Sequence, residues 1–109
     1  MNEVLEEIRA FVAARNWEQF HDPKNLAMAV ASEAGELAAE LRWVPNHDAD
    51  AWCRESDNHA RVRDEIADVA ITLTMLADRV GVDLAEAMRD KLIKNGEKYP
   101  VDRWKGQHE

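Results

Sequence analysis

The chain has 109 residues, of which 46% are hydrophobic and 33% are charged, and its formal net charge is −8 at pH 7. These values are ordinary for a globular protein, so we expect one domain that covers residues 1–109. The acidic balance argues against nucleic acid and against an anionic membrane surface as partners, because both attract basic proteins.

A reducing environment is consistent with the cysteine content. Cys53 is the one cysteine, so no intramolecular disulfide can form. The opening residues Met1-Asn2-Glu3 lack a basic stretch followed by an apolar one, so we expect no signal peptide. The longest apolar run, Leu26 to Ala31, is too short to span a bilayer. We therefore expect a cytoplasmic protein without a membrane partner.

The first half of the chain shows helical periodicity. Apolar residues between Asn2 and about Arg15 recur at helical spacing, which predicts a first helix. An aromatic loop follows, and Asp22-Pro23 predicts the start of a second helix that runs to about Trp43, because a capping residue precedes proline at the first helical position.

The second half repeats the pattern after an interruption. The polar residues of Val44 to Asn58 predict a loop, with Trp52 as its anchor. A third helix is expected from about His59 to Val80, and a fourth from Asp83 to about Lys94. No strand pattern competes, so the predicted fold is all-α and resembles a four-helix bundle.

Four carboxylates interrupt or flank the apolar stripes of the second and third helices. Glu33 and Glu36 form one pair and Glu65 and Asp68 another, each with an offset of three residues that places both side chains on one helix face. If the two helices pack antiparallel, the four groups converge, and such a cluster is unfavourable unless a cation neutralises it. A hard ion such as Mg²⁺, with Mn²⁺ as an alternative, suits an all-oxygen site.

Other interpretations of these acids stay open. A solvated, metal-free face is the ordinary role of a helical carboxylate, and it is the role expected of Glu40. A di-iron bundle would use Glu-x-x-His pairs, and neither pair here contains histidine.

Basic and aromatic residues could hold an anionic ligand beside such a metal. The basic residues gather late in the chain, at Lys91, Lys94, Lys98, Arg103 and Lys105. They suit phosphate groups, or simply stabilise a helix C-terminus. Trp17 and Trp43, at the two boundaries of the second helix, could stack on a base or only pack, and His21 could bond a base edge or support its loop.

Taken together in order, the motifs resemble one known family. The segments that carry the resemblance are residues 15–26, 32–37, 64–69, 91–95 and 98–100. They are similar to the all-α nucleoside triphosphate pyrophosphohydrolases of the MazG-like superfamily, most of all to its dCTP pyrophosphatase branch. The resemblance implies an Mg²⁺-dependent hydrolase that releases pyrophosphate and a nucleoside monophosphate, and it favours dCTP or a modified pyrimidine nucleotide and a role in cleaning the nucleotide pool. It also implies a homodimer or homotetramer.

The resemblance further implies roles for individual residues. Glu33, Glu36, Glu65 and Asp68 correspond to metal ligands, with Glu33 or Glu36 taking a proton from the attacking water. Trp17 and Trp43 correspond to base contacts, and Asn95, Lys98 and Tyr99 to a motif near the phosphates or sugar. Ser32, where many members have an acid, and Thr72, where dCTP-directed relatives tend to have tyrosine, depart from the pattern.

Two other classes of function remain as alternatives. A helical dimerisation or adaptor module could use the acidic face as a partner surface. A structural bundle could bind Mg²⁺ only for stability, in which case Mg²⁺ would raise the melting temperature and a non-hydrolysable nucleotide would not.

Overall fold

The computed structural model describes residues 2–104 and 106, and within them it contains helices and no strand, which confirms the all-α class. The long helices are α1 (Asn2–Ala14), α2 (Pro23–Leu41), α4 (Ser56–Arg79) and α5 (Leu84–Lys98). The short ones are η1 (Glu18–Phe20), η2 (Asn46–Asp48), α3 (Ala49–Arg54) and α6 (Val101–Trp104). In this part of the chain, no helix combines the length and the apolar character needed to cross a membrane.

Two helices begin where the sequence predicts, because a carboxylate caps each of them. The Asp22 carboxylate accepts a hydrogen bond from the Asn25 backbone N–H at 2.8 Å, and proline follows the cap. Asp83 accepts in the same way from the Glu86 N–H at 3.0 Å. These bonds satisfy backbone donors that have no partner inside the helix.

The prediction of a loop over residues 44–58 is wrong, because η2, α3 and the first turn of α4 lie there. The Asn58 side chain ties these short elements together by donating to the Trp52 carbonyl and to the Glu55 carboxylate, each at 3.0 Å. The fourth helix also extends past its predicted end to Lys98. A single glycine, Gly96, costs a helix only about 1 kcal/mol, so it does not end one.

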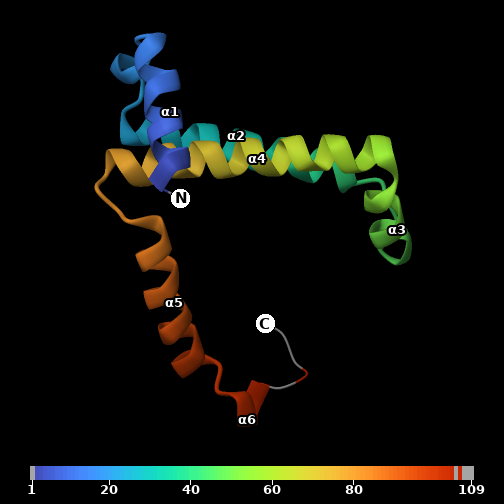
Figure 1. The fold of residues 1–109 in the computed structure, drawn as a ribbon. Helices are drawn as coiled ribbons and strands as arrows, with labels where there is room; N and C mark the ends of the chain where they lie inside the picture. The colour runs from blue at the N-terminus through green and yellow to red at the C-terminus, as the bar shows by residue number, and fades with distance from the viewer. Residues whose placement is uncertain (1, 105, 107–109) are drawn as a thin grey trace.

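The long helices are arranged around an antiparallel pair. α2 and α4 lie side by side along their length, and α1 crosses them near the start of α2 (Figure 1). The Arg9 guanidinium on α1 donates to both carboxylate oxygens of Asp78 on α4, which fixes this crossing. α5 leads away from the pair and makes only sparse contacts with it (Figure 1).

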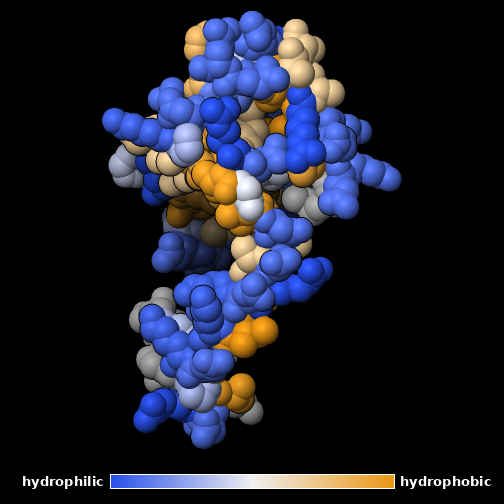
Figure 2. Space-filling model, turned by 90° about the vertical axis from the view of Figure 1, so that its left-hand side faces the viewer, coloured by the Kyte–Doolittle hydropathy of each residue, from blue (hydrophilic) through white to orange (hydrophobic). Residues whose placement is uncertain are grey.

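The described part of the chain buries few side chains. The buried apolar ones are Val12, Leu26 and Ala77, and Leu26 is the most deeply buried at 3% exposure. Large apolar side chains are instead exposed on both α4 and α5: Ile66, Ile71, Leu73, Met88, Leu92 and Ile93. Figure 2 shows hydrophobic surface both on the packed helices and on the projecting segment below them. This much exposed apolar surface is typical of an interaction face.

Candidate functional site

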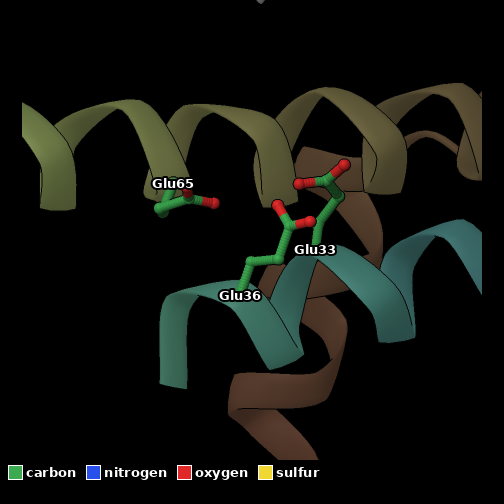
Figure 3. Close-up of side chains that lie close together, drawn as sticks. All are labelled: Glu33, Glu36 and Glu65. Atoms are coloured by element: carbon green, nitrogen blue, oxygen red, sulfur yellow. The ribbon is translucent and has the colours of Figure 1, made fainter. Parts of the chain in front are cut away.

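Three carboxylates meet between α2 and α4. Glu33 and Glu36 extend from α2 and Glu65 extends from α4, so that the Glu36 side chain lies between the other two (Figure 3). One oxygen from each carboxylate lies within 4.8 Å of the other two. The antiparallel packing of two long helices therefore brings the predicted acidic pairs face to face.

The environment of these groups disfavours their charged forms. Burial is the first cause that raises the pKa of Glu33, and the negative charge of Glu36 is the second. Burial followed by the Glu36 charge also raises the pKa of Glu65. One oxygen of Glu33 and one of Glu65, Oε2 in both cases, is buried and has no hydrogen-bond partner. Buried carboxylate oxygens without donors are costly unless a cation replaces the missing bonds.

Asp68 lies beside this cluster and, like Glu36, is exposed. The Asp68 charge contributes to the raised pKa of both Glu33 and Glu65. The four predicted acids therefore share one region of the seam, by which we mean the line of contact between α2 and α4. Its own oxygens do not belong to the group of three within 4.8 Å. The donor set is all oxygen and partly buried, which fits a hard divalent cation held by Glu33, Glu36 and Glu65 with Asp68 at its edge.

An apolar pocket of about 430 Å³ lies further along α4, one helical turn beyond Asp68. It is lined by Val4, Glu7, Ile8, Phe11, Trp17, Ile71, Thr72 and Met75. Thr72 follows Asp68 by one helical turn and donates its hydroxyl to the Asp68 carbonyl at 3.0 Å. The Trp17 ring meets the Phe11 ring edge-on at a centroid distance of 5.8 Å. A flat, apolar ligand in this pocket would therefore contact Trp17 and lie one helical turn from Asp68.

The structure places His21 and Trp43 outside that pocket. His21 is half-buried and lines a different cavity of about 330 Å³ beside Arg9 and Leu26. Trp43 follows the C-terminus of α2 and is 84% exposed, whereas Trp17 precedes the N-terminus of the same helix. Because α2 separates them, Trp17 and Trp43 cannot stack on the two faces of one base within a single chain.

The predicted phosphate-binding residues lie on α5 or directly after it, and α5 leads away from the α2–α4 pair that carries the acidic cluster (Figure 1). Lys91, Lys94 and Lys98 are exposed, and Asn95 and Tyr99 are half-buried. The ammonium group of Lys98 lies 5.2 Å from the centre of the Tyr99 ring. Lys105, from the same basic cluster, lies outside the described residues. One chain therefore does not bring these residues to the carboxylates.

Glu40 and Arg61 form a feature of the seam that sequence reasoning missed. Glu40 was expected on a solvated face, but its side chain is only 24% exposed and accepts from Arg61 Nε at 3.3 Å. The signal was present in the spacing, since Glu40 follows Glu36 by four residues and Arg61 precedes Glu65 by four. Both continue the faces that carry the metal-ligand candidates.

Comparison with known proteins places the chain in a family. Residues 33–109 match the MazG-like family, and the chain belongs to it. It is 39% identical over 106 residues to dCTP pyrophosphatase 1 of Bos taurus, which covers 94% of this chain and 63% of that protein. The human protein of the same name is 39% identical over 101 residues, 89% of this chain and 59% of the relative. The chain thus spans less than two thirds of the length of these relatives.

A solved structure supports the same assignment. The crystal structure of a pyrophosphatase from Archaeoglobus fulgidus superimposes with a TM-score of 0.85 at 37% identity and covers 92% of both chains. The fold and the resemblance expected from the motifs are therefore both confirmed.

Proposed function

We propose that this protein is an Mg²⁺-dependent nucleoside triphosphate pyrophosphohydrolase. It would convert a ribo- or deoxynucleoside triphosphate, with dCTP or a modified pyrimidine nucleotide favoured, into the monophosphate and pyrophosphate, and so clean the nucleotide pool. The observation that carries the proposal is the convergence of Glu33, Glu36 and Glu65 within 4.8 Å, with buried oxygens that have no hydrogen-bond partner. The names of the curated relatives and of the solved structure support it.

The candidate ligands for the cation are Glu33, Glu36, Glu65 and Asp68. Bound Mg²⁺, or Mn²⁺ in its place, supplies positive charge to the phosphate oxygens and makes water easier to deprotonate. By fixing the cation between α2 and α4, the carboxylates would determine where the reacting phosphate binds.

Proton transfer is assigned to the acids of α2. Water attacks the α-phosphorus, the bond from that phosphorus to the bridging oxygen breaks, and pyrophosphate leaves. The proton of the attacking water passes to the carboxylate of Glu33 or Glu36. In the metal-free protein, burial and the Glu36 charge raise the pKa of Glu33. A bound cation would offset both effects, so the choice of Glu33 or Glu36 as base follows from the family resemblance.

The base of the nucleotide fits the apolar pocket. Trp17 offers a ring on which a base can stack, and stacking tolerates different bases because each has a π-face. Thr72 lines this pocket at the position where dCTP-directed relatives tend to have tyrosine, and its side chain is smaller. His21 lies in a separate cavity, so its contribution to base binding would be indirect.

A homodimer or homotetramer would complete this site. The exposed apolar residues of α4 and α5 offer a surface for a second copy. That copy could deliver its own Trp43 and its α5 residues, including Lys91, Lys94 and Lys98, to the seam of the first. Within each subunit we propose a single domain over residues 1–109, acting in the cytoplasm on a free nucleotide rather than on nucleic acid or a membrane.

A panel of nucleoside triphosphates tests the function. Each is incubated with the purified protein with and without Mg²⁺, and pyrophosphate and monophosphate are quantified. We expect equal amounts of both products, dependent on metal, with the highest kcat/KM for a cytidine or modified pyrimidine deoxynucleotide. Asp68→Asn is expected to abolish turnover, while Asp64→Asn, an exposed neighbour on α4, is the matched control. No release from any nucleotide would refute the proposal and favour an adaptor module.

A further inference from the structure

The seam between α2 and α4 carries a basic group immediately beyond its acidic cluster. The acids of α2 follow one face at positions 33, 36 and 40, and the facing residues of α4 occur at 68, 65 and 61. Glu36 meets Glu65 within the three-carboxylate group, and Glu40 meets Arg61 at 3.3 Å. The last facing pair is therefore an ion pair, whereas the ones before it are acidic on both sides.

The Arg61 guanidinium is held in place but remains accessible. Its Nε donates to Glu40, and a terminal nitrogen donates to the side-chain oxygen of Asn58. Asn58 is itself buried and fixed by bonds to Trp52 and Glu55, so it anchors the guanidinium firmly. The Arg61 side chain is still 51% exposed, and within the described residues its other terminal nitrogen has no hydrogen-bond partner.

Three chemically different groups thus follow one another along α4. Arg61 comes first, Glu65 and Asp68 are one and two turns further on, and Thr72 marks the apolar pocket after another turn. A helical turn advances about 5.4 Å, so Arg61 lies on the opposite side of the carboxylates from the Trp17 pocket. An elongated ligand with an apolar end and an anionic end can lie along this order in only one direction.

We propose that Arg61 binds the distal phosphates, which leave as pyrophosphate, and thereby sets the direction of the nucleotide along the seam. The inference rests on the proposed function and adds a phosphate-binding residue to it. The base would lie in the apolar pocket, the α-phosphate at the carboxylates and the β- and γ-phosphates at Arg61. A planar guanidinium matches phosphate oxygens in geometry and charge, and Glu40 acts as a positioning residue that keeps it at the seam.

Within a single chain, the lysines of α5 are less well placed for this role. The α5 lysines lie away from the seam within one chain (Figure 1), so they need a second copy to reach it. Arg61 is present in the same helix as Glu65. The distal phosphates would lie close to four acids that repel them. A metal ion alone would divide its charge between these acids and the phosphates, so a further positive group nearby is needed.

Isothermal titration calorimetry in the presence of Mg²⁺ tests the proposal with two ligands, inorganic pyrophosphate and dCMP. Arg61→Gln removes the charge. Arg61→Met also removes it but keeps an apolar side chain beside Trp52, whose ring centre lies 6.0 Å from the Arg61 guanidinium carbon, so that two different replacements test the loss of charge. Arg63→Gln is the control, because residue 63 is exposed and lies two positions further along the helix, on another face.

We expect either Arg61 variant to bind pyrophosphate about tenfold more weakly and dCMP within about twofold of the wild-type protein, the loss typical of one charge-assisted hydrogen bond. Arg63→Gln is expected to leave both affinities unchanged. Unchanged pyrophosphate binding in the Arg61 variants would overturn the proposal, and so would an equal loss for both ligands or a wild-type protein that does not bind pyrophosphate. Lack of nucleotide hydrolysis by the wild-type protein, measured separately, would instead refute the proposed function.

Discussion

Replacing Glu65 by glutamine tests whether the acidic seam destabilises the metal-free fold. Glu65 supplies one of the three oxygens that lie within 4.8 Å of one another. This separation is shorter than the Debye length of about 8 Å at physiological ionic strength, so salt does not screen the repulsion away. Burial and the Glu36 charge raise the pKa of Glu65, which shows that its charged form is disfavoured. We therefore expect metal-free Glu65→Gln to melt above the wild-type protein.

Mg²⁺ is expected to reverse this order. A ligand that binds only the folded state adds about 2.7 kcal/mol of stability at a concentration 100 times its Kd. For a chain of 109 residues, about 1 kcal/mol moves Tm by roughly 4 °C, so the wild-type protein would gain about 10 °C. Changing even an outer-shell partner of a metal weakens binding by about 10–100-fold. After a 100-fold loss the same concentration adds only about 0.4 kcal/mol, or roughly 2 °C.

Differential scanning fluorimetry of both proteins, with and without Mg²⁺, measures the two effects in one experiment. Asp64→Asn removes a charge from the neighbouring, exposed position of α4 and serves as the control. It is expected to respond to Mg²⁺ as the wild-type protein does. A Glu65→Gln variant that gains as much from Mg²⁺ as the wild type, or that melts below it without metal, would contradict the reasoning.

Two further predictions concern stability. Leu26→Ala should lower the free energy of unfolding by about 2 kcal/mol, because Leu26 is only 3% exposed. This value is at the low end for a leucine deletion, since Leu26 borders a cavity that can relax. Urea denaturation measures the loss, and a value below about 0.5 kcal/mol would show that Leu26 is not part of the core. The metal-free protein should also lose stability as pH rises from 4.5, the ordinary pKa of Glu33 and Glu65, through their raised folded values, because the folded state binds these protons more tightly. Melting curves between pH 4.5 and neutral pH check the sign, and excess Mg²⁺ should reverse the trend.

Local signals in the sequence predicted the helix starts and the acidic pairs. Asp22-Pro23 and Asp83 cap their helices because a capping bond joins residues only three apart. The offset of three between Glu33 and Glu36 needs only the geometry of one helix to place both on one face. The same local rules failed over residues 44–58, where short helices depend on bonds to Asn58 and on packing against α4.

The position of the site depends on contacts between residues far apart in the chain. Helical periodicity does not state that Glu36 faces Glu65 or that Glu40 faces Arg61, because the register between two helices is set by side-chain packing along the whole seam. It also does not show that Trp17 lines the apolar pocket while Trp43 lies exposed outside it.

By itself, the order of residues determined the all-α class, the family and the four candidate ligands, since these follow from spacings within single helices and from short motifs. Only the tertiary structure decided which acids approach one another, where the apolar pocket lies and how far α5 extends from both. The physical reason is that hydrogen bonds within a helix are local, whereas the pairing of faces depends on burial and charge summed over segments distant in the sequence.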